Sequence, residues 1–305
     1  MIGPYERCAR SFIPALASTL FLASTVPLGC DGGSGDGGHD LSPWVQNDVG
    51  QAGGDTAQPD VGESDQPGPV ETQEPDLGDF VVEYELPQSP KLQDLASGIR
   101  DSGYPDALAE FLNTQLALPR DLPLVFAQCD KVNAYYAGED KRITICWEML
   151  VDIAQAFADH DWTDESGSVG TLALYAWTWV IFHEVGHALV DYYQLPITGK
   201  EEDAVDDFST LLLILDDSAE AAVHAAVYFR FQDNGEHPPS ALANEHGLHL
   251  QRFYNIMCIV YGSAPAEYGY FETQFPEMED RLPRCEGEYV QKLKSWATLL
   301  APWAK

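Results

Sequence analysis

The chain has 305 residues, of which 45% are hydrophobic, and it carries a formal net charge of −33 at pH 7. This length and composition suffice for a domain with a substantial core. The excess of acidic side chains persists after residues 1–80 are set aside. It argues against nucleic acid as a partner, because the phosphate groups would be repelled.

Residues 1–29 have the pattern of a secretion signal, in which two arginines precede an uncharged run rich in Phe, Leu, Ala, Ser and Thr. The run ends at Gly29-Cys30, which resembles the lipobox of bacterial lipoproteins, although Pro27 stands where leucine is usual. We therefore expect an exported cell-envelope protein with lipid on Cys30, which touches the membrane only through this anchor. Cleavage of the signal without lipidation is the alternative.

Residues 30–86 are predicted to form a disordered acidic linker. Residues 31–79 contain 11 Gly, 5 Pro and 12 Asp or Glu, with no Lys or Arg. Such a segment buries too little apolar surface to offset its ordering entropy, and its like charges extend it. We interpret it as a spacer, with a partner-binding tail as the alternative, and expect one folded domain over residues 87–305.

The first part of that domain mixes helices and strands, and its apolar pattern places a strand at 122–129 and helices at 91–101, 104–116 and 147–158. Residues 132–136 and 142–146 flank a Gly-Glu-Asp turn and predict a β-hairpin. The free edge of this hairpin either is ordinary sheet or pairs with an extended peptide by strand addition. The sequence leaves both open.

Residues 171–193, which read TLALYAWTWVIFHEVGHALVDYY, are predicted to form a helix because apolar residues recur at helical spacing without proline. The stretch contains an H-E-x-x-H motif, formed by His183, Glu184 and His187. The four-residue spacing places both imidazoles on one helical face, where they can bind one zinc ion. Glu184 could then take a proton from a zinc-bound water.

Two other interpretations of this helix are weaker. Two histidines and a glutamate buried in an apolar helix without a metal would need other partners, because burying ionisable groups is costly. A membrane span would need a longer apolar stretch, since the run over residues 171–182 has only 12 residues. The motif therefore favours a metal site.

A second helix is predicted over residues 201–213, after a break at residues 194–199. Its acidic first turn suits the positive end of the helix dipole, which is the simplest explanation of these residues. Two histidines do not complete a zinc site, however, so we expect a third ligand here. Glu202 is preferred over Glu201 because Asp206, one turn further on, could accept a hydrogen bond from a ligand histidine.

Four cysteines lie in the folded part, an even number in an exported chain, and predict two disulfides. Three connectivities are compatible with four cysteines. Closeness in sequence favours Cys129 with Cys146 and Cys258 with Cys285.

The C-terminal third is predicted to be mostly helical, over residues 217–231, 240–261 and 286–300. The middle helix would carry His246, His249, Arg252 and Tyr254, one of which could stabilise the oxyanion of a tetrahedral intermediate. His246 is the candidate, and an ordinary polar helix face is the alternative.

The combination of H-E-x-x-H with E-x-x-x-D on the next helix resembles the thermolysin-like, or gluzincin, arrangement. The chain also resembles a bacterial metallopeptidase family known as a domain of unknown function. The likeness covers about residues 87–300, through Cys129 and residues 133–135, 143–146, 183–189, 195–204 and 251–258. It implies a zincin-like fold and peptidase activity without naming a substrate.

The expected fold is therefore α+β, with a small sheet that includes an edge hairpin, the motif helix and a mostly helical C-terminal lobe. The expected function is hydrolysis of a peptide or protein substrate by a Zn²⁺ ion on His183, His187 and Glu202, with Glu184 as general base. A non-catalytic envelope lipoprotein that binds a partner and keeps a structural zinc site is the alternative. An open coordination position favours catalysis.

Overall fold

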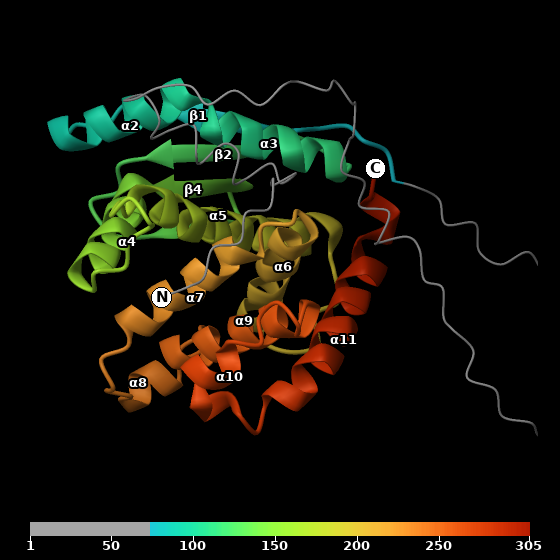
Figure 1. Cartoon of the computed structure of the whole chain (residues 1–305). Helices are drawn as coiled ribbons and strands as arrows, with labels where there is room; N and C mark the ends of the chain where they lie inside the picture. Colours follow the sequence, from blue (N-terminus) through green and yellow to red (C-terminus); the bar gives the residue numbers. More distant parts are fainter. Residues whose placement is uncertain (1–73) are drawn as a thin grey trace, which may run out of the picture.

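The computed structural model describes residues 74–305 (Figure 1). The predicted signal segment, Cys30 and most of the predicted linker lie outside these residues. The first strand, β1 (Phe80–Tyr84), pairs in parallel with β2 (Leu122–Ala127), and Phe80 is buried in the core. The folded part thus begins before residue 87, and the boundary predicted there is wrong because a five-residue strand next to an acidic segment gives little periodic signal.

The sheet has four strands in the order β1-β2-β4-β3. β4 (Arg142–Cys146) is parallel to β2, whereas β3 (Ala134–Ala137) is antiparallel to β4 and forms one of the two edges. The predicted hairpin is confirmed. Its outer strand is the free edge that the sequence could not locate.

Three helices of the first part lie within one or two residues of their predicted positions: α2 (Pro90–Ser102), α3 (Tyr104–Gln115) and α4 (Trp147–Asp159). Proline occupies the first turn of both α2 and α3, where its missing N–H costs nothing. Gly103 lies between them with a φ of 71°, a left-handed conformation that ends α2 and lets α3 begin at once.

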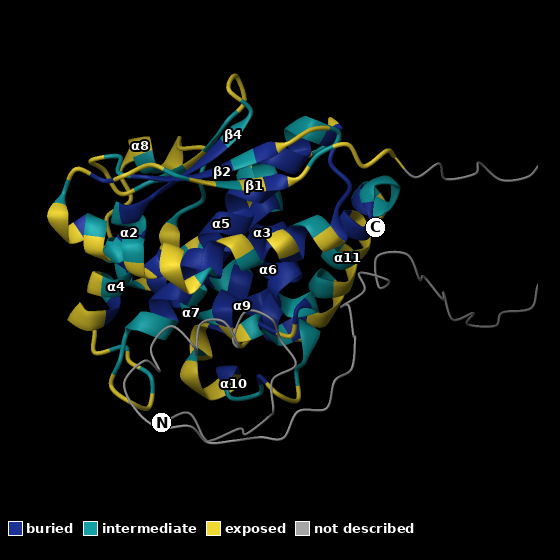
Figure 2. Ribbon diagram, turned by 90° about the horizontal axis from the view of Figure 1, so that it is seen from above, coloured by how far each residue is buried: buried dark blue, intermediate teal, exposed yellow. Residues whose placement is uncertain are grey.

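The central element is α5 (Gly170–Tyr193), which contacts the sheet and α4, α6 and α7. Figure 2 shows it buried in the middle of the molecule, as its apolar residues on all sides predict. α6 (Glu201–Leu215) packs directly on it at Gly186. A Cβ on Gly186 would lie 2.8 Å from the Cβ of Val205, so this glycine permits the close contact between the two helices.

The C-terminal part consists of α7 (Ala219–Gln232), α8 (Pro239–Leu242), α9 (His249–Ser263), α10 (Phe271–Gln274), the 3-10 turn η2 (Pro276–Met278), α11 (Leu282–Leu300) and the 3-10 turn η3 (Ala301–Trp303). The single helix predicted over residues 240–261 is wrong, because the chain turns between α8 and α9. α9 begins after Leu248, whose backbone N–H donates to the side chain of Gln251. His246 therefore lies in a connecting segment instead of a helix.

Both predicted disulfides are present, Cys129–Cys146 beside the hairpin and Cys258–Cys285 between α9 and α11. Disulfides indicate an extracellular or periplasmic protein, because thiols stay reduced in the cytosol. Over residues 74–305, no helix has the length and apolarity needed to cross a membrane. The α+β class is confirmed, with a small mixed sheet followed by a mostly helical C-terminal part.

Candidate metal centre

Side chains from α5 and α6 converge on one point. The Nε2 atoms of His183 and His187 lie 3.3 Å apart. One carboxylate oxygen of Glu202 lies 3.2 Å from Nε2 of His183, and the other lies 3.3 Å from Nε2 of His187. The motif helix and the helix that follows it thus bring the three predicted ligands together.

The two histidines are held at their distal nitrogens. Nδ1 of His183 lies 2.7 Å from Oδ1 of Asp206, and Nδ1 of His187 lies 2.7 Å from Oε1 of Glu201. A carboxylate at Nδ1 keeps the ring proton there and leaves the Nε2 lone pair free for a metal. Asp206 has the position that the sequence predicts. Glu201, considered as an alternative ligand, contacts instead the far side of His187.

The residues present fit a metal ion. Oε2 of Glu202 is buried and makes no hydrogen bond with the described residues, although Nε2 of His183 and Nε2 of His246 lie 3.2 and 3.0 Å away. His183, Glu202 and His246 are close enough to hold one ion. Imidazole nitrogens and a carboxylate oxygen are ligands for divalent transition metals.

The charges at this point are strongly coupled. Burial alone would lower the pKa of His187, but the carboxylates of Glu202 and Glu201 raise it to about 9. Burial alone would likewise lower the pKa of His183, but Asp206 and Glu202 raise it. Burial would raise the pKa of the Glu202 carboxyl, but the histidines around it hold that pKa far below its usual range. A bound cation would replace these protons between carboxylate and imidazoles.

Glu184 lies between the metal ligands and the edge of the sheet. Its side chain is buried, and its Oε2 accepts a hydrogen bond of 2.9 Å from the backbone N–H of Tyr136 in β3. Glu184, His187, Glu202 and His246 all line one cleft of about 950 Å³, together with residues of β3. A carboxylate in this place can reach a molecule that is bound between the ligands and the edge strand.

His246 reaches the site from the segment between α8 and α9. Its side chain is 43% exposed, and its ring faces that of His183 at a centroid distance of 6.3 Å. The other residues considered for its role point elsewhere: the ring of His249 stacks on Phe229, and Tyr254 donates to Glu277. Among the four candidates, His246 is the one that lines the cleft.

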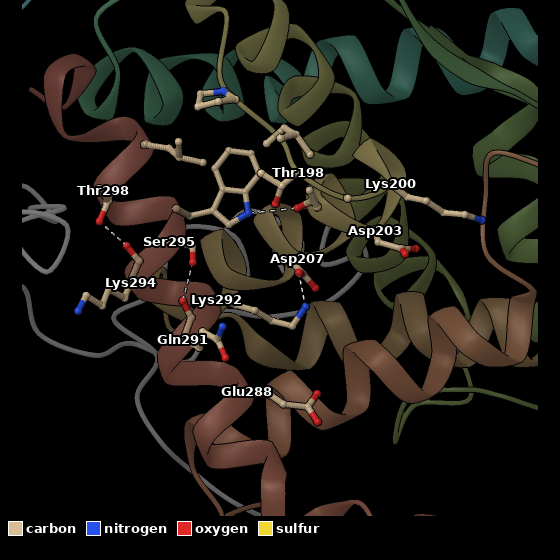
Figure 3. A pocket seen from close by; sticks show the side chains of 16 residues that line it. Thr198, Lys200, Asp203, Asp207, Glu288, Gln291, Lys292, Lys294, Ser295 and Thr298 are labelled. Carbon is tan, nitrogen blue, oxygen red and sulfur yellow. Dashed lines mark hydrogen bonds and ion pairs between the residues drawn. The ribbon is translucent and has the colours of Figure 1, made fainter.

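A second cavity, of about 770 Å³, lies between α6 and α11 (Figure 3). Asp207 and Lys292 form an ion pair across it, and the indole N–H of Trp296 donates to the backbone oxygen of Ala204. Burial raises the pKa of Asp207 to about 6, against the effect of Lys292. None of the predicted metal ligands lines this cavity, and its contacts fasten α6 to α11.

A protein family, DUF4344, described as a putative metallopeptidase, matches residues 84–300. The match contains the motif helix, Glu202, His246 and both disulfides, and it confirms the resemblance inferred from the sequence. The description implies a metal ion and a peptide substrate. No curated protein and no solved structure matches the chain. Because the matched residues make up well over half of its length, the chain belongs to the DUF4344 family of putative metallopeptidases.

Proposed function

We propose that the protein is a zinc-dependent peptidase with its active site in the cleft between β3 and the helices α5 and α6. The observation that carries this proposal is the convergence of two imidazole Nε2 atoms and one carboxylate, with Glu184 beside His187 and Glu202 in the same cleft. His183, His187 and Glu202 would hold the zinc ion, which when bound lowers the pKa of a water and polarises a carbonyl.

The remaining steps belong to side chains of the protein. The Glu184 carboxylate takes a proton from the attacking water and returns it to the nitrogen of the leaving amine. Asp206 and Glu201 hold the ligand imidazoles in place through their Nδ1 atoms. We assign the stabilisation of the oxyanion to His246, which lines the cleft and whose Nε2 lies 3.0 Å from Oε2 of Glu202.

The substrate would bind along β3 as an extra strand. The N–H of Tyr136 donates to Glu184 and not to β4, so the backbone at this residue faces the cleft and not the sheet. Ala134 lies two residues earlier and therefore has the same orientation. An extended peptide could pair with this edge and pass its backbone over the metal ligands.

A non-catalytic zinc site is the second candidate function. It draws support from the 3.0 Å separation of His246 Nε2 and Glu202 Oε2, because His246 could become a fourth protein ligand and close the site. The protein would then be an envelope component that binds a partner. In both cases we propose export and lipidation at Cys30, which rest on the sequence of residues 1–30.

The experiment that tests the peptidase proposal compares wild type with Glu184→Gln in a digest of a peptide library, with the zinc content of each protein measured in parallel. The variant should keep its zinc, because Glu184 is not a ligand, and should lose at least about a hundredfold in turnover. Glu139→Gln, in the exposed turn of the hairpin, is the matched control.

Full activity in Glu184→Gln would contradict the assignment of the base. A wild type that binds zinc and cleaves no peptide in the library would favour the non-catalytic alternative.

A further inference from the structure

A buried carboxylate links the metal site to α9. Both oxygens of Asp206 are engaged by Arg252, which donates from Nε to Oδ2 at 2.8 Å and from Nη2 to Oδ1 at 2.6 Å. Oδ1 also lies 2.7 Å from Nδ1 of His183. The carboxylate of Asp206 is therefore fixed from one side by a guanidinium and meets the ligand imidazole on the other.

The guanidinium is itself held by aromatic rings. Its Cζ lies 4.0 Å from the ring centroid of Phe229 and 5.3 Å from that of Trp179. Trp179 in turn stacks on His183 at 5.5 Å, and its indole N–H donates to Thr210. Residues of α5, α6, α7 and α9 thus form one connected set of contacts, which reaches His183 through Asp206 and Trp179.

The second ligand histidine lacks an equivalent. The side chain of Glu201, the partner of His187, is 47% exposed, against 7% for that of Asp206. Within residues 74–305, no Lys or Arg forms an ion pair with Glu201. The environment of His183 is therefore the more rigid of the two.

We propose that Arg252 is a positioning residue of the metal site, acting on His183 through Asp206. A planar guanidinium that binds both carboxylate oxygens fixes their plane, which a lysine cannot do. The fixed carboxylate sets the rotation of the His183 ring and keeps its proton on Nδ1, so that Nε2 is aimed at the ion. Arg252 also supplies the charge that a buried Asp206 requires. This inference rests on the metal binding in the proposed function, but not on peptidase activity.

The test measures zinc affinity by competition with a chelator, and the absorption spectrum of the cobalt-substituted protein, for Arg252→Met and Arg252→Lys. Arg252→Met should weaken zinc binding by about 10- to 100-fold and alter the cobalt spectrum. Arg252→Lys keeps the positive charge but lacks the planar guanidinium, so its zinc affinity should be intermediate. Arg230→Met is the matched control, since Arg230 also lies over two aromatic rings and pairs with a glutamate, but at a distance from the ligands.

A double variant shows whether the effect passes through Asp206. In an Asp206→Asn background, Arg252→Met should cause little further loss of zinc affinity, because coupled residues are not additive. Unchanged affinity and cobalt spectrum in either Arg252 variant, or independent losses in the double variant, would overturn the inference while leaving the peptidase proposal intact. Absence of zinc binding in wild type would overturn both.

Discussion

Three histidines inside this domain lie in two opposite environments. His183 and His187 face carboxylates, which favour their protonated forms when no metal is bound. His224, on α7, accepts a hydrogen bond of 3.1 Å from the indole N–H of Trp162 and stacks on Tyr175. Burial lowers the pKa of His224 to about 4. This residue is therefore a neutral part of the core and separate from the metal site.

The lowered pKa of His224 predicts a loss of stability in acid. Between pH 6.5 and 4 the unfolded chain takes up a proton at this position that the folded chain does not, so the free energy of unfolding falls as the pH is lowered. His224→Phe should remove up to about 3 kcal/mol of this dependence. The measurement is denaturant unfolding at a series of pH values in excess chelator, with His237→Gln as the exposed control. Parallel curves for wild type and His224→Phe would refute the assignment.

The convergence of His183, His187 and Glu202 could be predicted residue by residue because the spacing of H-E-x-x-H and E-x-x-x-D is itself helical geometry. The partner of Asp206 could not, since Arg252 lies 46 residues away and is brought to it only by the packing of α9. The contact of Glu201 with Nδ1 of His187 could not be predicted either, because its place in the first turn of the helix does not tell which ring nitrogen its side chain reaches.

The packing of α5 on α6 sets the geometry of the site at the scale of the elements. Val205 and Phe208 of α6 approach Gly186, which lies within the motif next to His187. This contact brings Glu202 within reach of both histidines. A larger residue at position 186 would separate the two helices and move the carboxylate away from the imidazoles.

Gly186→Ala should therefore destabilise the domain by about 1–3 kcal/mol, as overpacking does, and should also weaken zinc binding. Gly98→Ala in α2 is the matched control, because a Cβ there meets nothing within 4 Å and alanine favours a helix interior. Thermal unfolding with and without zinc separates the two effects. An unchanged unfolding temperature and zinc affinity in Gly186→Ala would show that the helices do not need this close contact.

Periodicity predicted the helices around the site and the hairpin beside it, but it failed at β1 and at the break between α8 and α9. A parallel strand is defined by pairing with a distant segment, here residues 122–126, which local spacing does not reveal. Residues 243–248, which read ANEHGL, contain no proline to end a helix, and the cap at Leu248 that ends the connection involves no Ser, Thr, Asp or Asn at that position. The sequence therefore did not indicate that His246 lies in a connecting segment beside the site.

The whole molecule places a small sheet and a set of helices around one central helix, with one disulfide beside the hairpin and another between α9 and α11. Cys129–Cys146 fastens the hairpin region and Cys258–Cys285 fastens α9, which carries Arg252. The first disulfide therefore constrains the hairpin region that contains β3, on one side of the cleft. The second constrains the helix whose Arg252 contacts Asp206, the partner of His183. Such bracing suits a site whose ligands must stay aligned outside the cytosol.

The most direct test of the account is the zinc affinity of Glu202→Gln compared with that of Glu201→Gln, measured by chelator competition on the purified protein. Glu202 is assigned to the ion itself, so its variant should lose most of the binding, with any residual activity partly restored by excess zinc. Glu201 touches only Nδ1 of His187, so its variant should keep the zinc with a loss of about 10- to 100-fold in affinity. Undiminished zinc binding in Glu202→Gln would contradict the assignment of the metal centre.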